Sequence, residues 1–153
     1  MEEPKIELIK HPQLMNVQDI NHRVWVLQGQ TLIAVPRKHH TVPVTCQHME
    51  NLEKDRGNSI YLGLKELELC LFCTKGGEWP ILQLKEQNIM DLYKQPKPVK
   101  PFLFYHSQSG RNSTFESVAF LGWFIAVSSE GGYPLILTQD LGKAHVTDFV
   151  LAT

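Results

Sequence analysis

The chain has no excess of charge of either sign and no long apolar run. Its 15 Lys and Arg nearly balance 16 Asp and Glu, for a formal net charge of −1, so it lacks the field that attracts nucleic acid or an anionic membrane surface. The longest uncharged apolar-rich stretch, residues 117–129, is well short of the roughly 20 residues of a membrane span. We therefore expect no nucleic-acid partner and no membrane insertion.

Cysteine is also scarce, and no secretory leader is visible. Three cysteines cannot all pair within the chain, so a disulfide framework is not expected. The first residues, Met1–Lys5, are acidic and are not followed by the apolar core of a signal peptide. With 153 residues, 42% of them hydrophobic, the chain is expected to form one globular domain and to be made in the cytosol.

What the sequence does contain is many short runs of aliphatic, aromatic and β-branched residues between turn residues, a pattern typical of an all-β protein. Glycines between neighbouring runs, such as Gly29, the pair Gly76-Gly77 and the pair Gly131-Gly132, indicate hairpins. One short helix is expected over Gln87–Tyr93. The predicted strands are Arg23–Leu27, Thr31–Val35, Thr41–Cys46, Ile60–Leu64, Leu69–Cys73, Ile81–Lys85, Phe102–His106, Thr114–Phe120, Trp123–Val127, Leu135–Thr138 and Thr147–Leu151.

The hairpins recur three times along the chain. Val24–Leu27, Cys70–Cys73 and Phe124–Val127 each lead through a turn to another apolar run, at intervals of about 50 residues. Three four-strand units that close into a small barrel form a β-trefoil of about 11 or 12 strands. A β-sandwich is the alternative all-β architecture, but it would not explain the threefold spacing.

The residues that could carry chemistry do not form a site. Cys70 and Cys73 have C-x-x-C spacing, but positions three apart in a strand face opposite sides, which predicts buried, inert thiols. His39, His40, Cys46 and His48 match no zinc-ligand spacing. No nucleophile elbow, P-loop or dinucleotide-binding glycine motif is present. We expect no catalytic residue, no metal and no cofactor.

One stretch resembles a known family. Phe115–Ala126 (FESVAFLGWFIA), followed by Pro134–Leu137 (PLIL), resembles the signature of the interleukin-1 cytokine family. Similar stretches extend the resemblance from about Val17 to the C-terminus, and within the family it is to the interleukin-36 group. These stretches are Val24–Leu27, Leu32–Pro36, Ile60–Gly63, Leu82–Lys85, Ile89–Tyr93 and Pro101–Tyr105.

The resemblance implies a function that the composition does not show. It implies a β-trefoil cytokine that is a monomer before receptor binding and is made as a cytoplasmic precursor, then released to the extracellular space without a signal peptide. It also implies an agonist of the interleukin-36 receptor that recruits the interleukin-1 receptor accessory protein and activates NF-kappa-B and MAP kinase signalling. A receptor antagonist on the same fold is the first alternative, and a non-cytokine trefoil binding module is the second.

Two departures from the family pattern bear on the fold. Leu121 stands where the family usually has proline, which should expose an apolar side chain before Trp123. About five strand residues, roughly one strand by length, are missing between Thr45 and Cys46. The first repeat should therefore close with a short strand near Cys46, or leave a neighbouring edge unpaired.

The resemblance also implies where the protein is processed and where it binds. Family agonists are trimmed about nine residues before a small-or-apolar–x–Asp motif, which Val17-Gln18-Asp19 matches, so cleavage is expected near Leu8 or Ile9. Residues 1–16 are then a flexible extension, and residues 17–153 form the trefoil domain. Candidate receptor-binding residues lie in three predicted loops: Arg37 and Lys38; Lys65, Glu66, Leu67 and Glu68; Gly142, Lys143, Ala144, His145 and Asp148.

Overall fold

The fold is described from a computed structural model, over residues 13–36, 44–49, 57–64, 67–140 and 145–152. Almost all of its regular structure is strand, with one short α-helix, α2 (Ile89–Tyr93), and one 3₁₀ turn, η2 (Lys100–Phe102). The strands are β1 (Gln13–Asp19), β2 (Arg23–Gln28), β3 (Thr31–Pro36), β4 (Val44–Met49), β5 (Asn58–Leu64), β6 (Leu69–Gly76), β7 (Trp79–Glu86), β8 (Leu103–Ser109), β9 (Asn112–Ser117), β10 (Phe124–Ser128), β11 (Ile136–Thr138), β12 (His145–Val146) and β13 (Phe149–Ala152).

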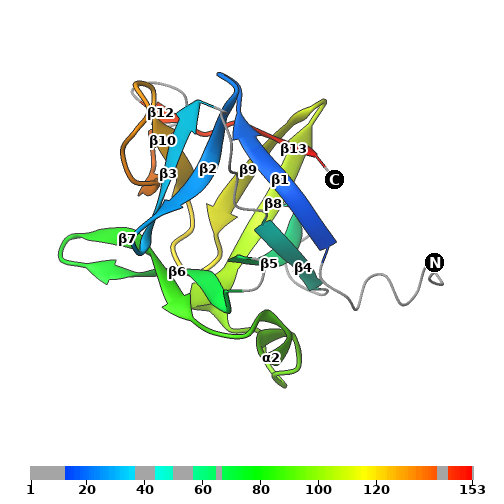
Figure 1. The fold of residues 1–153 in the computed structure, drawn as a ribbon. Helices are drawn as coiled ribbons and strands as arrows, with labels where there is room; N and C mark the ends of the chain where they lie inside the picture. The colour runs from blue at the N-terminus through cyan, green and yellow to red at the C-terminus, as the bar shows by residue number, and fades with distance from the viewer. Residues whose placement is uncertain (1–12, 37–43, 50–56, 65–66, 141–144, 153) are drawn as a thin grey trace.

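Six of these strands pair in a closed ring. β1 pairs with β4, β4 with β5, β5 with β8, β8 with β9, β9 with β13, and β13 returns to β1, all antiparallel. In Figure 1 this ring is the barrel formed around β1, β4, β8 and β13. Closure leaves no unpaired edge inside the ring, which suits a protein built from many short strands.

Three hairpins complete the architecture, one for each predicted repeat. They are β2–β3, β6–β7 and β10–β11, and each is antiparallel. The first hairpin is joined to the third: Leu135 N–H donates to Leu32 C=O at 2.9 Å, and Gly132 N–H donates to Ala34 C=O at 2.8 Å. A six-stranded barrel with three hairpins is a β-trefoil, so the predicted fold is confirmed.

Most predicted strands are present, but several boundaries were wrong. The strand predicted over Thr114–Phe120 ends at Ser117, because the chain turns there: Phe120 N–H donates to Ser117 Oγ at 3.0 Å, and Trp123 N–H donates to Phe120 C=O at 3.1 Å. β12 was not predicted. Neither was β1, which begins at Gln13, so residues 13–16 belong to the barrel and not to the extension.

β4, in the shortened first repeat, has a paired neighbour on each side. Val44, Thr45 and Cys46 pair with β1 on one side, and the whole of β4 from Val44 to Met49 pairs with β5 on the other. β4 has six residues, as many as β2 and β3, so the strand at Cys46 is of ordinary length and not the short one expected.

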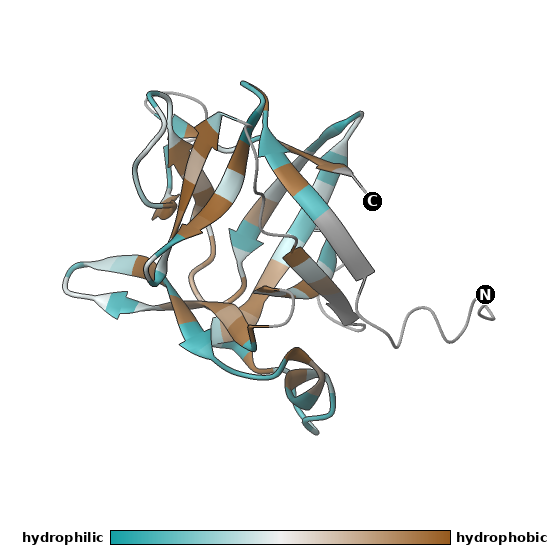
Figure 2. Cartoon of the chain, viewed as in Figure 1, coloured by the Kyte–Doolittle hydropathy of each residue, from teal (hydrophilic) through white to brown (hydrophobic). Residues whose placement is uncertain are grey.

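Apolar side chains fill the barrel, and the hydrophobic colouring lies mainly along the strands, with hydrophilic residues at the hairpin turns (Figure 2). Aromatic residues within strands usually pack in the core: Trp25 and Tyr61 are buried, whereas Trp123 and Phe124 are half-buried, with Trp123 packed against the main cluster. Leu92 of α2 and Phe102 of η2 belong to a second cluster around Tyr61. The main cluster includes Trp25, Leu62, Phe104, Phe115, Ile125 and Phe149.

The C-x-x-C pair lies on β6, and its two thiols do face different sides. Cys73 belongs to the main core cluster and Cys70 to the second. Both are buried, as is Cys46, and the pair forms no disulfide. Burial raises the pKa of each of the three thiols to about 12, with a hydrogen bond to Ser117 acting weakly the other way at Cys73.

The raised pKa predicts slow thiol chemistry. Because the thiolate is the reactive form, labelling of the folded protein at pH 8 should be about 10³-fold slower than labelling of the unfolded chain. Mass spectrometry after a timed iodoacetamide pulse, with and without guanidinium, measures the ratio. Full labelling of Cys46, Cys70 and Cys73 in the folded protein during the shortest pulse would contradict the prediction.

Leu121 sits in a tight turn that suits proline. Trp123 N–H donates to Phe120 C=O at 3.1 Å, and Gly122 has φ +90°, a combination that defines a type II turn with Leu121 at its second position. As expected from the family pattern, the Leu121 side chain is exposed, to 49%. No hydrogen bond among the described residues uses its N–H, so the position tolerates proline.

Leu121→Pro should therefore raise the free energy of unfolding by about 0.4–1 kcal/mol, because proline restricts the unfolded chain at a position already in the right conformation. Guanidinium unfolding followed by tryptophan fluorescence measures the change. Leu121→Ala removes the same side chain without the ring, and we expect it within about 0.5 kcal/mol of the parent. Destabilisation by proline alone would show that the backbone at Leu121 does not suit the ring.

Candidate functional site

The β5–β6 turn carries the described half of one predicted loop. Leu67 is 47% exposed, and its N–H donates to Leu64 C=O at 3.4 Å. Glu68 is exposed and has φ +51°, the left-handed conformation that a tight turn requires. Its carbonyl accepts the Gln87 N–H at 2.8 Å. The turn is thus tied to the end of β7, and both side chains project to solvent.

Leu67 and Glu68 line a shallow acidic hollow with residues that the sequence did not indicate. Glu86, at the end of β7, and Asp91, in α2, share the same hollow of about 710 Å³. Asn88 orders this side by accepting the Met90 and Asp91 N–H groups at 2.9 and 3.1 Å, as a helix N-cap does. Three carboxylates on one open surface favour a basic partner surface.

A second predicted loop is represented by His145 and Asp148. His145 lies in β12, opposite Ser128 of β10, and its Nδ1 atom is buried without a hydrogen-bond partner among the described residues. Asp148 is half-buried between β12 and β13. These two residues stand on different elements from Leu67 and Glu68, and no hydrogen bond or ion pair in the described ranges joins the two pairs.

The remaining predicted contact residues lie outside the described residues. They are Arg37, Lys38, Lys65, Glu66, Gly142, Lys143 and Ala144, and the predicted cleavage region around Leu8 and Ile9 lies outside them as well.

The predicted processing motif is built into the barrel. Val17 and Asp19 are buried in β1, where they pair with Leu151 and Phe149 of β13. The Asp19 carboxylate accepts three hydrogen bonds: from Asn21 N–H at 2.8 Å, from Arg23 N–H at 3.0 Å and from Arg23 Nε at 2.9 Å. The last of these is also an ion pair. Gln18 is half-buried between the two.

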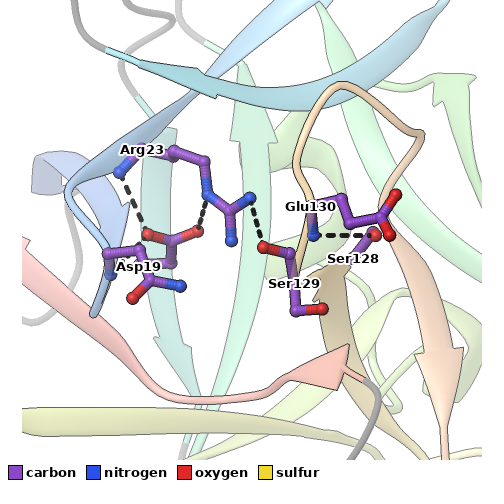
Figure 3. A network of polar contacts seen from close by, with 6 residues as sticks. Asp19, Arg23, Ser128, Ser129 and Glu130 are labelled. Atoms are coloured by element: carbon purple, nitrogen blue, oxygen red, sulfur yellow. Dashed lines mark hydrogen bonds and ion pairs between the residues drawn. The ribbon is translucent and has the colours of Figure 1, made fainter.

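Arg23 extends this network across the molecule. Its Nη1 donates to Ser129 C=O at 3.0 Å, which joins the β1–β2 turn to the turn after β10 (Figure 3). Gly131 lies so close that a Cβ added there would be 2.5 Å from Arg23 Nη1. The motif therefore positions a distant turn as well as ending β1, a role that its sequence pattern did not indicate.

Within the described residues, no helix is long and apolar enough to cross a membrane. The same residues contain no group of three His, Cys, Asp or Glu side chains placed to hold a metal ion. Of the described candidate residues, Leu67 and Glu68 lie exposed in a turn, and binding residues are often carried on such loops.

A comparison with protein families identifies the class. The family model described as Interleukin-1 / 18 matches residues 38–151, most of the chain. The chain therefore belongs to the interleukin-1 family of cytokines. As a member of a cytokine family it is not an enzyme, and it is a secreted protein that acts by binding a receptor.

Within the family, the chain is similar to interleukin-36 alpha. The Homo sapiens protein is 73% identical over 148 residues, 94% of each chain. The Mus musculus protein is 57% identical over 143 residues, which cover 90% of this chain and 89% of the mouse protein. The NMR structure of the pro-inflammatory cytokine interleukin-36alpha superposes with a TM-score of 0.79 at 68% identity, covering 99% of this chain and 98% of that one. The run His106–Thr114 also resembles that member in particular.

Proposed function

We propose that this chain is an agonist of the interleukin-36 receptor that recruits the interleukin-1 receptor accessory protein, and so activates NF-kappa-B and MAP kinase signalling. The observation that carries the proposal is 73% identity to human interleukin-36 alpha over 94% of both chains. Identity on this scale extends over the surface as well as the core, so surface loops that contact a receptor are expected to be similar too.

Binding of this kind needs a surface of about 800 Å² on each partner, so several loops must act together. Leu67 and Glu68, with the neighbouring Glu86 and Asp91, supply one acidic part of such a surface. The other proposed contacts are Arg37, Lys38, Lys65, Glu66, Gly142, Lys143, Ala144, His145 and Asp148. Receptor binding then depends on charge complementarity, which acts chiefly on the association rate.

We also propose that the chain is made as a cytoplasmic precursor, is released without a signal peptide and is trimmed near Leu8 or Ile9. A cut there leaves the whole of β1, which begins at Gln13, and leaves the Asp19 network intact. An untrimmed tail next to the barrel would lose conformational freedom when a receptor covers it, which weakens binding.

The test is reporter activation in cells that carry the interleukin-36 receptor and the accessory protein, with chains that begin at Met1, at Leu8 and at Ile9. We expect the trimmed chains to activate at much lower concentration. Equal activity of all three chains would contradict the trimming proposal and leave agonism in place. No activation by any chain, with folding verified by circular dichroism, would overturn the agonist proposal, and competition against a known agonist would then identify an antagonist.

A further inference from the structure

An apolar groove lies between the third hairpin and β7, away from the acidic hollow. Trp79 and Ile81 of β7 form one wall, and Trp123 and Ile136 the other. The groove holds about 620 Å³, within the range of pockets that bind ligands or inserted side chains. The Trp79 and Trp123 rings lie 5.7 Å apart between centroids, tilted by 49°.

The part of the groove that β7 contributes is exposed apolar surface. Leu82 and Leu84 of β7 turn inward and pack against the core, whereas Trp79 and Ile81, on the opposite face, are 60% and 37% exposed. Strand alternation predicts polar residues on that face. A contiguous apolar patch that does not stabilise the fold marks a contact surface, and exposed tryptophan is typical of binding hot spots.

One end of the groove is acidic. Asp140 lines this end, and its backbone N–H donates to Thr138 Oγ1 at 3.0 Å, which stabilises the turn that follows β11. In the described part of the chain no cation pairs with the Asp140 carboxylate. Two indole rings and a carboxylate with no cation beside it in the described ranges together favour a guanidinium, which stacks on aromatic faces and forms strong hydrogen bonds to carboxylates.

We propose that this groove receives an apolar, arginine-bearing segment of the receptor's extracellular part. The arginine stacks on the tryptophan rings on one side and bonds to the Asp140 carboxylate on the other. The inference rests on the proposed function and adds a second contact surface, apart from the loops predicted from the sequence. Charge complementarity selects this occupant: an acidic segment would be repelled by Asp140, and an uncharged one would leave its carboxylate unpaired beneath the bound partner.

The experiment measures binding of the folded protein to the immobilised extracellular domain of the interleukin-36 receptor, alone and with the accessory protein. Trp79→Ala should weaken binding at least tenfold, mainly through faster dissociation, while Trp79→Phe keeps an aromatic wall and should stay within about threefold. Asp140→Asn should weaken binding about fivefold at low salt and reduce its salt dependence. Glu130→Gln, at an exposed turn residue that does not line the groove, is the charge-matched control and should leave binding within about twofold.

Each other outcome is decisive. If the parent binds and both Trp79→Ala and Asp140→Asn bind like it, the groove inference is overturned and the proposed function stands. If Trp79→Ala weakens binding and Asp140→Asn does not, the assignment of an arginine is overturned, and the occupant of the groove is uncharged. A concentration-dependent dimer that Trp79→Ala dissociates in sedimentation would assign the groove to a second copy and overturn the proposal. A parent that binds neither receptor chain overturns the proposed function itself. Should Trp79→Ala fail to fold, Ile81→Ser takes its place.

Discussion

Replacing Asp19 with alanine should lower the free energy of unfolding by about 3–5 kcal/mol, because it leaves the Arg23 guanidinium buried without its anion. The two side chains are 0% and 9% exposed and lie 2.9 Å apart. The substitution also removes the acceptor for two backbone N–H groups, at Asn21 and Arg23. Guanidinium unfolding followed by tryptophan fluorescence measures the loss, and amide NMR shifts at Ser129 and Gly131 report whether the distant turn moves.

The control for Asp19→Ala removes the cation as well. In the double variant Asp19→Ala with Arg23→Met no charge is left buried, so we expect it to recover part of the stability lost by the single change. A single variant that loses less than about 1 kcal/mol would show that the pair behaves like an exposed ion pair. If the double variant lost more unfolding free energy than the two single variants lost together, the unpaired charge would not be the source of the loss.

The sequence predicted the hairpins because their pattern is local. Each hairpin joins two short apolar runs through a turn, so period and turn chemistry are sufficient. β1 was missed because it gains its place from β13 and β4, far along the chain, and its own residues alternate only weakly. β12, which is two residues long, was missed for the same reason, since in the described residues it pairs only with β10.

The candidate site was less predictable than the fold. Leu67 and Glu68 were found through the family resemblance, but Glu86 and Asp91 join them only because the end of β7 and α2 fold back against the same turn. Nor could the sequence show that Trp123 lies half-buried at the rim of the core, because its contact with Trp79 joins residues 44 positions apart in the chain.

Phe149→Ala should cost about 3–5 kcal/mol, because the side chain is fully buried at the place where the barrel ring closes. Its ring meets Trp25 edge-on at 5.5 Å and Phe115 at 5.9 Å between centroids. Its backbone pairs with Asp19 of β1 and Ser113 of β9. A cavity here therefore loosens the packing between three barrel strands and the first hairpin. Denaturant unfolding measures the loss as a shift of the midpoint.

Two further variants separate the cavity from other effects of the change. Phe149→Leu keeps most of the apolar volume, so it should cost less than half of the alanine change. Tyr133→Ala removes an aromatic ring that is 56% exposed, and we expect a change within about 0.5 kcal/mol. If Phe149→Ala cost no more than Tyr133→Ala, the ring would not be held by its neighbours and β13 would close the barrel through its backbone alone. Because the Phe149 ring is fully buried and its backbone pairs with both β1 and β9, the full loss is expected.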